Sequence, residues 1–262
     1  MSPGDGLFSN LTAVFSDFDG TLTTSGRFLA STHAALEQLE AAGVDVVIVT
    51  GRPSGWADVF ARTLPVRAVV AENGGVVVVP KAGGRGLRRI YGVNLRELPL
   101  LRRKMLAAAR AVIRQVPGAR LASDVTFTEV NLAIDWNEDV KLPEEAARRV
   151  EKLLRERGYR AVRSSVHVNF WPGRFDKLTA CRRVVREVLG GSARDLSPYL
   201  YVGDALNDEP MFRGFPRSVG VANIKQVWEE LEHKPAHVTR AAEGRGFEEL
   251  AAAILAYQRR GK

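Results

Sequence analysis

Hydrophobic runs of two kinds alternate along the first third of the chain. The β-branched run Val44–Val49 predicts a buried strand. Before it, Thr32–Ala42 places Leu36 and Leu39 on one face and ends at Gly43, which predicts a helix. Strands that alternate with helices favour a parallel sheet covered by helices on both faces.

The same reasoning extends the pattern. It predicts further strands at Leu11–Phe15, Arg67–Ala71 and Val76–Val79. It also predicts a helix at Pro53–Leu64. After residue 173 it predicts helices at Lys177–Leu189 and Phe247–Tyr257, and strands at Tyr199–Val202, Ser218–Val221 and Ala236–Thr239.

The pattern between these two parts is different. Residues 81–86, KAGGRG, read as a glycine-rich linker, and Leu98–Val116 predicts a long amphipathic helix. Apolar residues alternate with polar ones over 130–136 and 166–170, which is typical of half-buried antiparallel strands, and Pro143–Arg157 predicts a second helix. We therefore expect a Rossmann-like α/β core of residues 1–83 and 173–262, interrupted by an inserted α+β module at 84–172.

Composition narrows the class of protein. The chain has 262 residues, of which 45% are hydrophobic and 26% charged, as in ordinary globular proteins. No apolar run approaches the roughly 20 residues that cross a bilayer. The start MSPGDGLFSN lacks the basic residues of a secretory signal, and the single cysteine, Cys181, excludes an internal disulfide. These features predict a cytoplasmic protein without a membrane partner.

The net charge of +8 is concentrated in the module. Residues 84–172 hold 18 Lys and Arg against 10 Asp and Glu, and the rest of the chain is balanced. A basic module favours an anionic ligand. Nucleic acid is a weaker candidate, because the sequence has neither an aromatic-basic recognition motif nor zinc-finger spacing. Nothing in the sequence indicates an oligomeric state.

Polar clusters stand where predicted core strands end or helices begin. Asp17 and Asp19 lie in SDFDGTLT, residues 50–52 follow a strand, Lys177 opens a helix, and GDALND, residues 203–208, follows YLYV. Ligands of open α/β sheets bind at the carboxyl ends of strands. Each cluster alone also fits a turn, a helix cap or a surface lysine. Two carboxylates as close as Asp17 and Asp19 nevertheless repel each other unless a cation lies nearby.

The clusters, taken in order, resemble the motifs of the haloacid dehalogenase-like phosphohydrolases. DFDGTLT matches the first motif, Thr50-Gly51-Arg52 the second, Lys177 in RFDKLTA the third and GDALND the fourth. Residues 72–75, ENGG, resemble a turn of the Cof-type branch, in which a large cap of type IIB is inserted between the second and third motifs. The resemblance implies that the module is such a cap and closes over the active site as a lid.

The resemblance also implies roles for individual residues. Asp17 would attack phosphorus and form an aspartyl-phosphate, and Asp19 would act as general acid and base. Mg²⁺ would be held by Asp17, the backbone carbonyl of Asp19 and Asp204, with Asp208 close by. The phosphoryl oxygens would be held by Thr50, Gly51 and Lys177. Candidate substrate contacts are Arg52, Asn73, His167, Asn169 and Asn207, and Asn207 has the alternative roles of orienting Asp204 or Asp17 or of shaping the turn.

The function implied is that of a magnesium-dependent phosphomonoester hydrolase. Its substrate would be a small anionic phosphorylated metabolite, and we expect a sugar phosphate. A phosphohexomutase of the phosphomannomutase type stays open, because PGRFDK resembles the third motif of those enzymes, although they carry Gly-Gly-Ser where this chain has Thr50-Gly51-Arg52. A non-catalytic nucleic-acid-binding protein is the remaining alternative. A receiver domain also uses Asp, Thr and Lys but has no inserted cap of this size.

Overall fold

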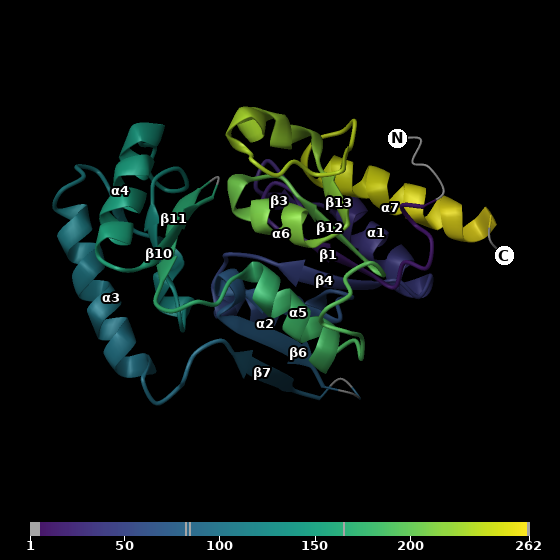
Figure 1. Cartoon of the computed structure of the whole chain (residues 1–262), viewed down its shortest axis with the longest axis horizontal. Coiled ribbons are helices and arrows are strands. Elements are labelled where there is room, and N and C mark those ends of the chain that lie inside the picture. The colour runs from purple at the N-terminus through teal and green to yellow at the C-terminus, as the bar shows by residue number, and fades with distance from the viewer. Residues whose placement is uncertain (1–5, 82, 84, 165, 261–262) are drawn as a thin grey trace.

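The fold consists of two units that differ in size and in sheet type, and Figure 1 shows them side by side. The computed structural model describes residues 6–81, 83, 85–164 and 166–260. The strands of the large sheet are β1 (Ala13–Ser16), β4 (Asp45–Val49), β5 (Ala68–Ala71), β6 (Val76–Pro80), β7 (Leu87–Tyr91), β12 (Tyr199–Gly203), β13 (Arg217–Gly220) and β14 (His237–Val238). Within the described residues their order is β14-β13-β12-β1-β4-β5-β6-β7.

Helices cover both faces of the large sheet. They are α1 (Ala30–Ala41), α2 (Ser54–Thr63), α5 (Lys177–Glu187), α6 (Glu209–Gly214) and α7 (Glu243–Arg260). Alternate residues of β4 explain the two layers: Val46 and Ile48 pack in one core with α1, α2 and α7, whereas Val47 and Val49 pack in the other with α5 and α6. A strand buried on both faces reads as a continuous apolar run, as Val44–Val49 does.

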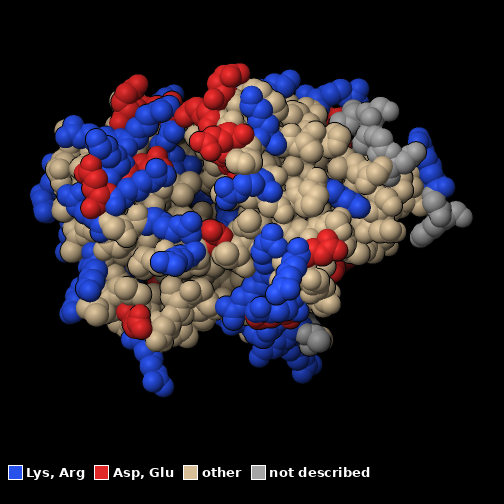
Figure 2. Space-filling model, in the orientation of Figure 1, with Lys and Arg blue, Asp and Glu red and all other residues tan. Residues whose placement is uncertain are grey.

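The second unit, residues 98–171, is called the small unit below. Its strands are β8 (Arg120–Leu121), β9 (Leu132–Asp135), β10 (Arg160–Arg163) and β11 (His167–Trp171), paired antiparallel in the order β10-β11-β9-β8. Helices α3 (Leu98–Ile113) and α4 (Glu144–Glu156) pack on this sheet, where Met105 and Val150 share a core with Ile134 and Val168. Lys and Arg side chains gather over this unit in Figure 2.

The predicted fold class is confirmed: the chain is mixed α/β, with a large parallel sheet between helices. Two features differ from the sequence prediction. β6 and β7 run antiparallel to their neighbours at one edge of the sheet. β7 also lies inside the range expected for the module, yet it pairs with β6 of the large sheet. The expected limit at residues 83 and 84 stays a prediction, because residues 82 and 84 lie outside the described residues.

The topology determines where the polar clusters meet. β1 pairs in parallel with β12 on one side and with β4 on the other, so the carboxyl ends of these strands are neighbours. The segments that follow them hold the first, fourth and second clusters. Short 3₁₀ turns complete this edge: η1 (Glu72–Gly74), η3 (Leu206–Asp208) and η4 (Ala222–Glu230). Among the described helices, none combines the length and apolarity needed to span a membrane.

Candidate active site

Lys177 is held between two carboxylates at the centre of the candidate site. It is the first residue of α5, after Asp176, whose side chain caps the helix by accepting the Thr179 N–H at 2.8 Å. The Lys177 Nζ donates to Asp17 Oδ1 and to Asp208 Oδ1, each at 2.7 Å. All three charged side chains are buried. Capping by Asp176 fixes the residue at which α5 begins, and Lys177 at that position directs its ammonium group at Asp17.

Asp208 organises the loop that follows β12. Its Oδ1 also accepts the Tyr201 hydroxyl at 2.5 Å, and its Oδ2 accepts the backbone N–H groups of Asp204 and Ala205 at 3.0 and 3.2 Å. Gly203 precedes the loop, and a Cβ there would come within 2.4 Å of Asp208 Oδ2. Asp208 therefore holds Asp204 in place as well as facing Lys177.

Asp204 is fixed by side chains that the sequence analysis missed. Thr21 Oγ1 donates to Asp204 Oδ1 at 3.0 Å, and Asn223 Nδ2 donates to Asp204 Oδ2 at 2.8 Å and to the Gly20 carbonyl at 3.1 Å. Gly20 has a φ of +75°, and a Cβ there would come within 2.4 Å of Asp204 Oδ2. In the sequence, Asn223 only follows the predicted strand Ser218–Val221, and the structure shows that this strand lies next to β12.

Carboxylate oxygens of Asp17, Asp204 and Asp208 lie within 4.8 Å of one another. Burial raises the pKa of Asp17, an effect that Lys177 opposes and Asp208 reinforces. Burial and the charges of Asp17 and Asp208 likewise raise the pKa of Asp204. The negative charge exceeds the single positive charge of Lys177, so a cation would stabilise the ionised cluster. A buried, oxygen-only ligand set fits a hard divalent ion such as Mg²⁺.

Two of the predicted phosphate-binding residues, Thr50 and Gly51, line a narrow space between the two units, whereas Lys177 lines a neighbouring cavity. Thr50 is buried after β4, and its Oγ1 accepts the Arg52 N–H at 3.0 Å. A Cβ on Gly51 would lie 3.3 Å from the side-chain amides of Asn73 and Asn169. The space has a volume of about 20 Å³, and its lining joins both units: Asp17, Asp19, Thr50, Gly51, Arg52, Ser164, Val166, His167, Asn169, Ala205 and Asn207.

Asp19 lines the same narrow space as Asp17, but its carboxylate pairs with Arg52. Its carboxylate, 24% exposed, accepts hydrogen bonds from Arg52 Nε at 2.9 Å and Arg52 Nη2 at 2.8 Å. The sequence analysis expected Arg52 to contact substrate, but in the structure its guanidinium is engaged by Asp19 and by Glu138 of the small unit. The side chain of Asp19 is therefore separate from the group formed by Asp17, Asp204 and Asp208.

The other expected substrate contacts lie in different surroundings. His167 Nε2 lies 2.8 Å from Glu138 Oε2, and Asn169 accepts a long hydrogen bond of 3.4 Å from Asn131. Asn73 is buried in η1 with a φ of +55°. Asn73 and Asn207 also line a cavity of about 520 Å³ whose lining includes Lys177.

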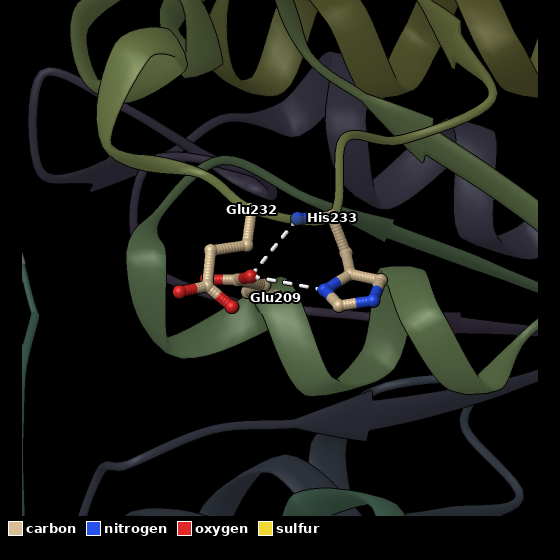
Figure 3. A group of neighbouring side chains, drawn as sticks. All are labelled: Glu209, Glu232 and His233. Carbon is tan, nitrogen blue, oxygen red and sulfur yellow. Dashed lines mark hydrogen bonds and ion pairs between the residues drawn. The ribbon is translucent and has the colours of Figure 1, made fainter.

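A second acidic group illustrates how the buried cluster differs from an ordinary surface grouping. Glu209, Glu232 and His233 lie close together at the start of α6 and in the segment after η4 (Figure 3). Glu209 Oε1 accepts the backbone N–H of His233 at 2.9 Å, with the His233 ring 3.3 Å away. Glu232 and His233 are exposed, and no sequence motif includes the three residues. This group therefore fits a local turn contact.

The fold and the site together define a class of protein. The sheet carries an aspartate, a threonine and further aspartates at neighbouring strand ends, and a lysine at the start of an adjoining helix. Phosphoryl transfer can use these groups: a carboxylate, a cation beside it and an oxygen-rich cluster that could hold a metal ion.

Comparisons with known proteins identify the family. The family model for haloacid dehalogenase-like hydrolases matches residues 14–88. A phosphoglycolate phosphatase of Haloarcula marismortui is 31% identical over 241 residues, which cover 90% of this chain and 94% of that protein. The chain therefore belongs to the haloacid dehalogenase-like hydrolases, and within them it is a phosphatase.

Solved structures agree with this fold. The sucrose-phosphatase of Synechocystis, solved with sucrose and phosphate, superposes with a TM-score of 0.66 at 17% identity, covering 94% of this chain and 98% of that one. A sugar phosphatase of subclass IIB of the same superfamily superposes with a TM-score of 0.64 at 17% identity, covering 93% of this chain and 98% of that one. At such identities the match concerns the fold.

Proposed function

We propose that the protein is a magnesium-dependent phosphomonoesterase that works through an aspartyl-phosphate. The observation that carries the proposal is the contact of Lys177 with Asp17, beside Asp204 and Asp208, in one buried cluster. Asp17, Asp204 and Asp208 are the side chains that would hold Mg²⁺, together with the backbone carbonyl of Asp19. When bound, the ion would neutralise charge on the phosphoryl oxygens and on the crowded carboxylates.

Each step then follows from the placement of this chain's residues. A carboxylate oxygen of Asp17 forms a bond to phosphorus while the bond from phosphorus to the leaving oxygen breaks, and Asp19 gives that oxygen a proton. Asp19 next takes a proton from water, which attacks phosphorus and releases phosphate and free Asp17. Lys177 and Thr50 support the phosphoryl oxygens in both steps, and the narrow space beneath the small unit excludes other water.

The small unit takes the part of a type IIB cap in this proposal. By sheet membership the core includes β7, so we place the change from core to cap after Tyr91 rather than at residue 84, and the return near residue 173. The cap contributes Ser164, Val166, His167 and Asn169 to the space above Asp17. We further propose a cytoplasmic enzyme, in accordance with its single cysteine, which is buried.

The proposed substrate is a small phosphorylated metabolite with a polar leaving group, such as a sugar phosphate. A cavity of about 320 Å³ opens beside Asp204 between the two units and is lined in part by Trp136, Ser164 and Gln226. Arg163, which also lines it, is paired with Glu144, Glu151 and Glu230. A hydroxyl, an amide and an aromatic ring with little unpaired charge suit hydroxyl groups.

Phosphate release from a metabolite panel tests this function. The panel holds sugar monophosphates, phosphoglycolate and p-nitrophenyl phosphate, each with Mg²⁺ and with chelator. We expect turnover only with Mg²⁺, none in Asp17→Asn, and unchanged turnover in Asp45→Asn, which alters a carboxylate at the amino end of β4, whereas the candidate site lies at the carboxyl ends of the strands. Phosphate release by Asp17→Asn at the wild-type rate would remove Asp17 as the nucleophile. Isomerisation that needs a bisphosphate primer would indicate a mutase instead.

A further inference from the structure

Arg52 connects the two units through its guanidinium group. On the core side it binds both oxygens of Asp19, with Nε at 2.9 Å from Oδ2 and Nη2 at 2.8 Å from Oδ1. On the other side it binds both oxygens of Glu138, with Nη2 at 2.8 Å from Oε1 and Nη1 at 3.2 Å from Oε2. Asp124 Oδ2 lies 3.6 Å from Nη1. The planar guanidinium thus links a carboxylate of the core to carboxylates of the small unit.

The small unit places Glu138 rigidly. Asp135, at the end of β9 and fully buried, accepts the backbone N–H groups of residues 137 and 138 through Oδ1 at 3.1 and 2.9 Å, and that of Asp139 through Oδ2 at 3.0 Å. The Glu138 carboxylate also lies 2.8 Å from His167 Nε2 on the neighbouring strand β11. Because its loop and its side chain are both held, Glu138 moves only with the small unit.

The surroundings of Arg52 keep its guanidinium in one orientation. The Arg52 side chain is 8% exposed and lies over the Trp56 ring, with the guanidinium carbon 4.8 Å from the ring centroid. The hydrogen bond with His167 lowers the pKa of Glu138, burial opposes this, and Arg52 lowers it further, to about 2. Glu138 is therefore ionised at neutral pH and attracts Arg52 whenever the small unit is in its present position.

We propose that Glu138 is a positioning residue that acts through Arg52 to hold the Asp19 carboxylate beside Asp17 when the small unit covers the site. This inference rests on the proposed function, in which Asp19 exchanges protons with the leaving group and with water. When the small unit moves away from the core, Arg52 loses its contacts with Glu138 and Asp124. Among the described residues, Asp19 is then the carboxylate that Arg52 still contacts. The acid–base group is then correctly held only over an enclosed substrate.

Substrates with different leaving groups can distinguish a positioning role of Glu138 from a role in closing the small unit alone. An alkyl leaving group needs a proton as its bond to phosphorus breaks, whereas p-nitrophenolate leaves without one. The value of kcat/KM reports steps up to the first phosphoryl transfer. Misplacing Asp19 therefore lowers kcat/KM for an alkyl phosphate and largely spares it for the aryl phosphate. Weaker closure without misplacement lowers both values by the same factor.

The test compares Glu138→Gln with Asp139→Asn, a neighbouring change on the same loop. Asp139 is 43% exposed and pairs with Arg120 rather than with Arg52. For the best alkyl substrate of the panel, we expect Glu138→Gln to lower kcat/KM about tenfold or more, a part of the roughly 10²- to 10⁴-fold that general acid catalysis contributes. For p-nitrophenyl phosphate we expect a change below about threefold. Asp139→Asn should match wild type on both.

Two reference variants complete the design. Asp19→Asn shows the loss expected when the acid–base group is removed, and Arg52→Lys keeps the charge but not the fork that binds two carboxylates. Arg52→Lys should reproduce the leaving-group dependence of Glu138→Gln. Equal loss on both substrates, or no loss, in soluble and folded Glu138→Gln overturns the positioning role while phosphate release by wild type still supports the proposed function. Absence of phosphate release by wild type overturns both.

Discussion

Lys177 Nζ donates a 2.7 Å hydrogen bond to Asp17 Oδ1, although 160 residues separate the two in the sequence. The contact joins the first turn of α5 to the residue that follows β1, and Asp208 accepts a second 2.7 Å hydrogen bond from the same nitrogen. Since Lys177 and Asp208 are almost fully enclosed, these charges depend on each other for stability as well as for chemistry.

Replacing Lys177 with methionine should destabilise the protein and abolish turnover. The change leaves Asp17 and Asp208 without their shared cation, and breaking a buried ion pair costs about 3–5 kcal/mol. The free energy of unfolding from urea denaturation measures the effect. Lys152→Met is the control, since Lys152 is 77% exposed and should change stability by less than about 0.5 kcal/mol. Wild-type stability in Lys177→Met would contradict the assigned pairing.

Magnesium should raise the midpoint of thermal unfolding, because the ion binds the folded site. Binding at 100 times the dissociation constant adds about 2.7 kcal/mol to the free energy of unfolding. Asp204→Asn should remove the shift, since Asp204 is a member of the buried cluster. Glu232→Gln, in the exposed group of Figure 3, should keep it. The reverse result for these two variants would relocate the metal site.

Asn223→Ala should weaken Mg²⁺ binding without touching a residue proposed to bind the ion. Its Nδ2 holds Asp204 Oδ2, while its Oδ1 accepts the Glu243 N–H at 2.9 Å, so the amide is oriented from both ends. Loss of such a partner reduces metal affinity by about 10- to 100-fold. Calorimetric titration with Mg²⁺ measures the change, and Asn94→Ala, an exposed turn residue, is the comparison. Equal affinities in both variants would exclude this role.

The contribution of Glu138 to stability should persist in mild acid. Its pKa is lowered from 4.5 to about 2, chiefly by the hydrogen bond with His167. A carboxyl whose folded pKa is depressed stabilises fully above its unfolded pKa, and it loses that contribution as the pH falls through the folded value. The difference in melting temperature between wild type and Glu138→Gln should therefore be constant from about pH 8 to 5 and shrink below about pH 4.5.

Thermal unfolding of both proteins across this range checks the sign. The same series in 1 M salt should show a smaller difference, because the Glu138 side chain is 31% exposed and its attraction to Arg52 is partly screened. A difference that grows as the pH falls from 5 to 3 would show that the carboxyl is not held in its ionised form.

Local pattern determined much of this protein. The run Val44–Val49 and the helical spacing after Gly51 need no distant contact to be recognised, because burial on two faces or on one stripe leaves a period in the sequence. The same runs place Thr50 and Asp204 at strand ends, and their order along the chain matches the family. Fold class and phosphatase activity could therefore be predicted from the sequence.

The strand at the edge of the large sheet and the contact partners of the site residues were decided only by the tertiary structure. The edge strand β7, Leu87–Tyr91, buries little besides Ile90, so its sequence lacks a clear period, and its place beside β6 depends on packing. The contacts of Asp204 with Asn223 and of Arg52 with Glu138 likewise have no local pattern. Such side chains meet because strands and units pack together over long sequence distances. The free energy of each such contact depends on burial and on neighbouring charges, which exist only once the chain has folded.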